Sequence, residues 1–263
     1  MRKYILVPVL ITAGSAGAFL MRLSQMRTGF EALTGLPVPH DPWQYVLPVF
    51  LLILAVLLAL AVSRVPESAQ PPAAFAGAFF TTDAIMLALP AAGILLTALS
   101  GVLELAAGLT TGLRAQLLTG ILSLLSAGSL LPAAAACRRP GSHQIQPEAP
   151  RQLNCALLLV TPVCLVTRLV LTYRQDSVDP TLSAYYIELL AIVFLTLAFY
   201  RLASFAFQAG KTRRYLLYAG AAVILSAATL ADGHQLSGTL FYAGGALSQL
   251  GFLLLRLETL AKP

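Results

Sequence analysis

Long runs of apolar residues, separated by short polar stretches, make up most of the chain. A helix needs about 20 mainly apolar residues to cross the ~30 Å hydrocarbon layer of a membrane, and eight runs reach or approach this length. These runs are apolar on all sides rather than alternating, which favours helices over the strands of a membrane β-barrel. The pattern therefore predicts an all-α, polytopic membrane helix bundle of about eight transmembrane helices. The runs are Tyr4–Arg22, Trp43–Ser63, Ile85–Leu109, Ala115–Cys137, Gln152–Tyr173, Leu182–Phe205, Tyr215–Ala231 and Leu236–Arg256.

The first of these runs has a second interpretation. Arg2 and Lys3 precede an apolar run and the small-residue stretch Ala13–Ala18, a pattern that is also typical of secretory signal peptides. The apolar run continues through Phe19–Met21, however, and is long enough to span a membrane. We therefore expect a transmembrane helix here. The run at 215–231 is the shortest of the eight.

The composition supports a membrane protein and excludes several soluble classes. Hydrophobic residues make up 58% of the chain and charged residues only 11%, whereas about 25% of the residues in an average soluble domain are charged. A disordered chain, a disulfide scaffold and a nucleic-acid-binding domain are excluded on this ground. The net charge of +6 is accordingly interpreted as a topology signal. We expect the lipid bilayer, and no nucleic acid, as a partner.

The distribution of lysine and arginine predicts the orientation in the membrane. Cytoplasmic loops of membrane proteins carry an excess of these residues. If the N-terminus is cytoplasmic, 12 of the 17 basic residues fall in cytoplasmic segments and 4 in outer segments, with Arg168 inside a span. Both termini are therefore predicted to face the cytoplasm. The short loops and the strong bias are typical of a multi-pass protein of a cell membrane, here a bacterial cytoplasmic membrane.

The most polar and proline-rich stretch divides the chain. It predicts a cytoplasmic linker at residues 138–151 between a first four-helix membrane half, 1–137, and a second, 152–263. Asp-Pro precedes a span in each half, at 41–42 and at 179–180. Four helices in each half would make the halves a parallel 4+4 repeat. Chance likeness between apolar sequences explains the same similarity, so both interpretations stay open.

Three charged residues lie inside predicted spans, where a charge costs at least ~2.5–3.5 kcal/mol. Arg168 is five residues before the outer end of its span, Glu188 is about six residues into the next, and Glu104 is near the outer end of a third. Because a short loop joins the spans of Arg168 and Glu188, we predict an ion pair between these two side chains. The pair would either fix the rotation of neighbouring helices or belong to a ligand or ion site. Glu104 has no obvious partner apart from Arg114.

A binding site is expected to open outward, because the predicted outer side is richer in polar and aromatic residues than the inner side. A small amphipathic or charged solute is the expected ligand. The simpler interpretation of tyrosine at this level is an interfacial belt. The predicted ligand-binding residues are Arg168, Glu188, Glu104, Arg22 and Tyr185.

Two of the three histidines lie beside carboxylates in predicted outer loops, as His40-Asp41 and as Asp232-Gly233-His234. Together they offer nitrogen and oxygen ligands to a zinc-like ion. No HxxxH or HExxH pattern accompanies them, and solvated loop residues are the default interpretation. A GxxxxGK[ST] nucleotide loop and a bis-histidine helix pair are also lacking. No resident metal, cofactor or catalytic residue is predicted.

Three functions are compatible with the sequence. The preferred one is small-solute binding or transport through an outward-facing cavity, supported by the charges inside spans. The second is a non-catalytic membrane subunit or scaffold that holds a partner protein, favoured by the lack of catalytic motifs. The third is a membrane-embedded, metal-dependent hydrolase that uses the outer histidines and aspartates. It ranks last, and an enzyme is the less favoured class.

Overall fold

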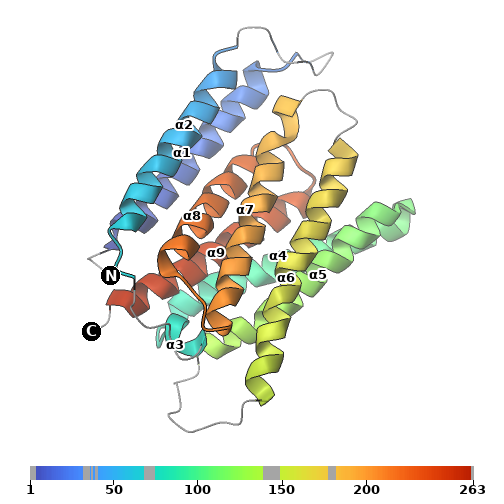
Figure 1. Cartoon of the computed structure of the whole chain (residues 1–263). Coiled ribbons are helices and arrows are strands. Elements are labelled where there is room, and N and C mark those ends of the chain that lie inside the picture. Colours follow the sequence, from blue (N-terminus) through green and yellow to red (C-terminus); the bar gives the residue numbers. More distant parts are fainter. Residues whose placement is uncertain are drawn as a thin grey trace.

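A computed structural model of the chain shows long helices packed side by side (Figure 1). The structure describes residues 4–31, 36, 38, 41–67, 75–138, 149–176 and 182–261. The prediction of an all-α, polytopic helix bundle is confirmed. Within the described ranges the helices are α1 (Leu6–Thr28), α2 (Trp43–Ser63), α3 (Phe75–Phe79), α4 (Ala84–Thr111), α5 (Arg114–Arg138), α6 (Ala149–Asp176), α7 (Leu182–Ala206), α8 (Thr212–Thr229) and α9 (Leu236–Ala261).

Within the described residues, seven helices are long and apolar enough to cross a membrane, namely α1, α2, α4, α5, α6, α7 and α9. The eighth predicted span, Tyr215–Ala231, forms α8, which does not meet the same criterion. Its first turn carries Arg213 and Arg214, and 12 of its 18 residues are buried. The buried residues of α8 include large apolar side chains such as Leu216 and Leu225 as well as small and polar ones such as Gly220 and Ser226, and the two arginines of the first turn lower the mean hydropathy of this short helix.

Six helices form a closed ring in which each packs against the next, in the order α4, α5, α6, α7, α8 and α9. α9 completes the ring by packing along α4, and it also contacts α7 across the interior. The α1–α2 hairpin lies outside the ring, where α1 packs against α8 (Figure 1). The interior of the ring is therefore bounded on all sides by protein rather than by lipid.

The helices begin and end at two ends of the bundle (Figure 1). The α4–α5 and α8–α9 connections lie at one end, together with the C-terminal ends of α1 and α6 and the N-terminal ends of α2 and α7, and we call this the loop end. The short helix α3 contacts α5, α7 and α9 at the opposite end, which we call the α3 end.

α3 closes the α3 end through aromatic packing and hydrogen bonds. Phe79 is fully buried, and its ring packs edge-on against those of Phe205 and Tyr215, with centroids 5.2 and 5.8 Å away. The carbonyl of Ala78 accepts a hydrogen bond of 3.2 Å from Arg256 Nη1. The Arg256 guanidinium lies 5.2 Å from the Phe205 ring centroid. A buried cation thus holds α3 against the ends of α7 and α9.

The division of the chain into two four-helix halves stays a prediction. α5 ends at Arg138 and α6 begins at Ala149, so that most of the predicted linker lies outside the described residues. Helices from the two predicted halves pack against each other at several places, since α1 contacts α8, α4 contacts α9, and α5 contacts α6.

Candidate functional site

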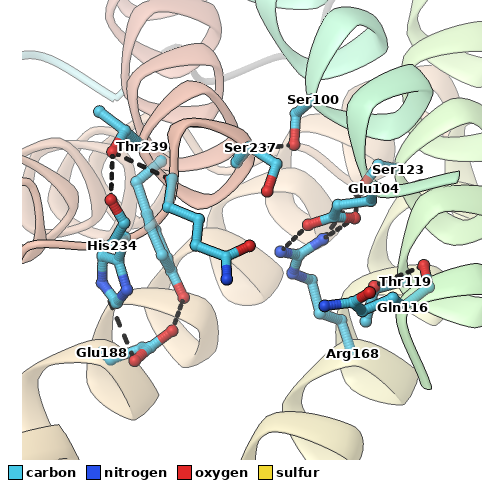
Figure 2. A network of polar contacts seen from close by, with 12 residues as sticks. Ser100, Glu104, Gln116, Thr119, Ser123, Arg168, Glu188, His234, Ser237 and Thr239 are labelled. Atoms are coloured by element: carbon cyan, nitrogen blue, oxygen red, sulfur yellow. Dashed lines mark hydrogen bonds and ion pairs between the residues drawn. The ribbon is translucent and has the colours of Figure 1, made fainter. Parts of the chain in front are cut away.

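Buried charged side chains gather at the loop end of the bundle. Arg22 on α1 is 0% exposed, and Glu104 on α4 and Arg168 on α6 are each 7% exposed. Glu188 on α7 and Asp232 in the α8–α9 loop have side chains 18% and 6% exposed. Figure 2 shows two groups of contacts, one around Arg168 and Glu104 and the other around Glu188 and His234. Four of the five predicted ligand-binding residues therefore lie in one region.

Arg168 forms an ion pair with Glu104 and not with Glu188, so the predicted Arg168–Glu188 pair is wrong. Its Nη2 donates to Glu104 Oε1 at 2.7 Å and its Nη1 to Glu104 Oε2 at 3.1 Å. Nη1 also donates to Ser123 Oγ on α5 at 2.8 Å, and the guanidinium lies 3.7 Å from the ring centroid of Phe241 on α9. The expectation that Glu104 has no partner apart from Arg114 is corrected by the same contacts. The bidentate pair and the hydrogen bond to Ser123 tie α4, α5 and α6 together (Figure 2), and the Phe241 contact adds α9.

Glu188 is bonded to a tyrosine and lies next to a histidine. The hydroxyl of Tyr242 on α9 donates to Glu188 Oε1 at 2.6 Å. The other carboxylate oxygen, Oε2, lies 3.9 Å from Nε2 of His234. The rings of His234 and Tyr242 also face each other, with centroids 5.3 Å apart. Glu188 thus links α7 to α9 and to the α8–α9 loop.

Asp232 is held by Arg22 at the base of the α8–α9 loop. Arg22 Nε donates to Asp232 Oδ1 at 2.5 Å, and Arg22 Nη1 donates to Gln25 Oε1 at 2.8 Å. The second oxygen of Asp232, Oδ2, lies 4.0 Å from His234 Nε2. Burial raises the pKa of Asp232, and the adjacent Arg22 guanidinium partly opposes that rise. A lower pH therefore favours the folded form of this loop.

The predicted ligand residue Tyr185 is half-buried, and it is the next residue, Tyr186, that faces the charges. The Arg22 guanidinium lies 5.9 Å from the Tyr186 ring centroid. The Tyr186 hydroxyl is buried and has no hydrogen-bond partner among the described residues. One step along a helix turns a side chain by about 100°, so sequence alone does not separate two adjacent tyrosines.

Other polar residues inside the ring were not predicted from the sequence. Tyr242, Gln249 and Arg256 recur at intervals of seven residues on one buried face of α9. Tyr215 on α8 donates to Gln249 Oε1 at 3.5 Å, and Thr212 accepts from Arg256 Nη2 at 2.7 Å. The seven-residue spacing was a signal that could have identified this stripe, because it places side chains on one side of a helix. Polar groups therefore continue along α9 from the loop end to the α3 end.

A small cavity lies inside the ring between α4, α5, α6, α7 and α9, with room for about one water molecule. Thr161, which lines the cavity, has its Oγ1 atom 2.6 Å from Ser129 Oγ. Phe241 forms one wall of the cavity and contacts Arg168 with its ring. The cavity combines hydroxyl groups with apolar walls. Its lining residues are Thr97, Ser126, Leu130, Thr161, Leu165, Leu195, Phe199, Phe241 and Gly245.

The predicted grouping of histidines and aspartates does not form a metal site in the described part of the chain. His40 lies outside the described residues, and no group of three His, Cys, Asp or Glu side chains within them is placed to hold a metal ion. Glu188 and Asp232 approach His234 Nε2 only to 3.9 and 4.0 Å. Ligands to a tetrahedral zinc ion lie roughly 3.3 Å apart, as follows from zinc–ligand distances of about 2.0 Å.

Comparisons with protein-family models, with curated proteins and with solved structures found no match to the chain.

Proposed function

We propose that the protein binds a small polar or charged solute inside the helix ring and carries it across the membrane. The observation that carries this proposal is the line of buried polar groups that runs through the interior of the ring. It begins at Glu188 and Tyr242, continues through Gln249 and Tyr215, and reaches Arg256 at the α3 end. Polar groups at membrane depth are costly, and those that face a bundle interior commonly mark a solute or ion path.

Two polar atoms beside this line have no hydrogen-bond partner in the described chain. They are Gln249 Nε2 on α9 and Ser226 Oγ on α8, and both are buried. A buried polar atom without a partner costs about 1–3 kcal/mol. A purely structural interior gains nothing from carrying these groups. A solute or water molecules that pass along α8 and α9 would satisfy them.

Both ends of the proposed path are closed in this conformation. Arg22–Asp232 and Glu188–Tyr242 close the loop end, and the packing of Phe79 on α3 closes the other. The small cavity, whose lining comes from α4, α5, α6, α7 and α9 and includes none of the residues on this line, has room for about one water molecule. We interpret the structure as an occluded state, in which the helices must move apart at one end before a larger solute enters.

The lining of the cavity favours a small amphipathic solute. Thr97, Ser126 and Thr161 line the cavity with hydroxyl groups that donate to backbone carbonyls and keep their oxygens as acceptors, while Leu195 and Phe199 are apolar. A solute with one polar and one apolar part matches both surfaces, as is usual for sites with a few placed polar groups in an apolar pocket.

A thermal-shift screen with a matched pair of variants on α6 tests the proposal. Thr161 is 1% exposed and lines the cavity, whereas Thr167 is exposed and bonds only to Val163 of its own helix. We expect one class among amines, small carboxylates, amino acids and polyols to raise the Tm of the full chain in nanodiscs. At a solute concentration of 100 times the Kd, the folded chain would be stabilised by about 2.7 kcal/mol.

Thr161→Val is expected to raise at least tenfold the solute concentration that is needed for the same Tm shift. Thr167→Val is expected to leave this concentration unchanged. If no class of solute shifts the Tm, or if both variants change the response equally, the proposed function is wrong.

A second candidate, a scaffold for a partner membrane protein, is favoured by one observation. Arg168 and Glu104 form a closed pair that is sealed by packing, as expected for charges that only fix helix positions. In this alternative the exposed apolar side of α2, which includes Leu52, Val56 and Leu60, would contact lipid or another helix. Failure of the solute screen would favour this function.

The orientation of the chain gives a separate prediction. Leu113 in the α4–α5 turn is 54% exposed at the loop end, and Phe207 in the α7–α8 connection is 50% exposed at the other end. Because the basic residues predict cytoplasmic termini, we expect Leu113→Cys to react with a membrane-impermeant maleimide on intact bacterial cells. Phe207→Cys should react only after permeabilisation. The unsubstituted chain, whose cysteines are buried or half-buried, is the control, and the reversed pattern would contradict the predicted orientation.

A further inference from the structure

Three titratable side chains converge at the loop end without forming a complete hydrogen-bonded set. His234 Nε2 lies 3.9 Å from Glu188 Oε2 and 4.0 Å from Asp232 Oδ2. The Asp232 side chain is only 6% exposed, yet its Oδ2 has no hydrogen-bond partner in the described chain, and neither has His234 Nε2. Both distances are too long for a hydrogen bond. A small movement of the side chains would bring the atoms within hydrogen-bond distance.

The charges around His234 are unbalanced. Arg22 carries one positive charge, while Asp232 and Glu188 carry two negative charges when ionised. Among the described residues of α7 and α9, the uncharged hydroxyls of Tyr186 and Tyr242 also face this cluster. The pair formed by Arg168 and Glu104 is neutral in itself. Among the described residues, one additional proton therefore neutralises the cluster.

Histidine is the side chain whose ordinary titration lies between pH 5 and 8. When the imidazole accepts a proton from water it becomes an imidazolium, and an N–H is then present at Nε2 whichever tautomer came before. This N–H faces two carboxylate oxygens about 4 Å away, so a small movement completes a hydrogen bond to one of them. Loss of the proton leaves two carboxylates beside a neutral ring.

We propose that His234, Glu188 and Asp232 form a proton-binding site that closes the loop end when it is protonated and opens it when the proton leaves. The inference rests on the proposed transport function and names the proton as its coupling ion. The protonated site joins α7 to the α8–α9 loop and, through Arg22, to α1. In the deprotonated site the carboxylates of Glu188 and Asp232 repel each other, and this repulsion loosens the same contacts.

Histidine-selective NMR on the full chain in nanodiscs tests proton binding directly. The chain has three histidines, and His234→Gln identifies the signal of the third. We expect Glu188→Gln to weaken the proton affinity of His234 at least tenfold. Asp232→Asn is the second variant if Glu188→Gln does not fold, and it should act in the same direction. Glu67→Gln, at an exposed position beyond α2, is the control and should leave the titration unchanged.

Hydrogen exchange across residues 230–245 tests whether the proton closes the loop end. After correction for the intrinsic pH dependence of exchange, we expect at least tenfold stronger protection at pH 5.5 than at pH 8. His234→Gln, in which glutamine has no titratable group, should reduce this difference to the part that the buried Asp232 carboxyl contributes.

The outcomes separate this inference from the proposed function. Equal His234 titrations in the Glu188→Gln and Glu67→Gln variants, or pH-independent protection in the unsubstituted chain, would overturn the proton site. That result leaves the solute screen unaffected. A proton site that behaves as expected in a chain that binds no solute would instead overturn the transport function, while the pH-dependent closure itself would stand.

Discussion

Replacement of Arg168 by methionine is expected to lower the free energy of unfolding by about 3–5 kcal/mol. The substitution removes both hydrogen bonds to Glu104 and leaves that carboxylate, 7% exposed, with Ser123 as its neighbour. A buried charge without its counter-charge pays the full cost of leaving water. The contact of the guanidinium with the Phe241 ring is lost as well. Unfolding of the purified chain in mixed micelles, followed by circular dichroism during a denaturing-detergent titration, measures the loss.

Two further variants show whether the loss comes from the pair. Arg114→Met removes an exposed arginine at the start of α5 and is expected to change the free energy of unfolding by less than about 0.5 kcal/mol. The double variant Arg168→Met with Glu104→Met removes both charges and should recover most of the loss, because an apolar pair of similar volume needs no compensation. A loss below about 1 kcal/mol in Arg168→Met would contradict a tightly paired, buried arginine.

An exchange of the two charges also distinguishes the two candidate functions. Arg168→Glu combined with Glu104→Arg keeps an ion pair at the same place. If the pair only positions helices, the exchanged chain should fold and should respond to solutes as before. If the pair also attracts the solute, the chain should fold and lose the thermal shift.

The sequence predicts at which end of the bundle the buried charged side chains gather, but it does not predict which of them form ion pairs with each other. Counting residues from the ends of the apolar runs places Arg168, Glu188 and Glu104 at a similar depth, because every helix rises by the same 1.5 Å per residue. The partner of Arg168 depends on the rotation of α6 about its axis and on which helices close the ring. α6 turns Arg168 toward α4, a helix that is distant in the sequence and contributes Glu104. Adjacency in the chain favoured Glu188 and gave the wrong pair.

Burial inside the ring also limited the sequence prediction. α8 was expected as a span on its apolar residues, yet its surroundings are mainly other helices, so mean hydropathy describes it poorly. The sequence does not predict Gln249 and Tyr242 as buried polar groups for a related reason. Each is a single polar residue inside a long apolar run, and only the seven-residue spacing along α9 reveals that they share a buried face.

Replacement of Gly93 by leucine is expected to prevent the bundle from assembling. Gly93 lies where α4 crosses α9, and a Cβ atom there would meet the backbone nitrogen of Ser248 and lie 2.6 Å from the carbonyl oxygen of Gly244. These are backbone atoms, so the strain cannot be relieved by a change of rotamer, and the two helices must separate. Inserting one methylene into a packed core costs about 1–3 kcal/mol, and a whole leucine side chain at a backbone contact costs more. The amount of monodisperse protein in size-exclusion chromatography measures the effect.

Gly128→Leu provides a matched control for this prediction. Gly128 lies in the middle of α5, is exposed, and has no atom within 4 Å of a Cβ placed on it. Both substitutions raise the intrinsic helix propensity by a similar amount, close to 1 kcal/mol, so any difference between them reports packing alone. In a membrane, small residues allow the close approach of helices that the hydrophobic effect does not drive. The α4–α9 crossing completes the ring that encloses the buried polar path, so we expect Gly93→Leu to yield no monodisperse protein and Gly128→Leu to yield as much as the unsubstituted chain. Equal yields from both variants would mean that α4 and α9 do not pack backbone to backbone in the membrane.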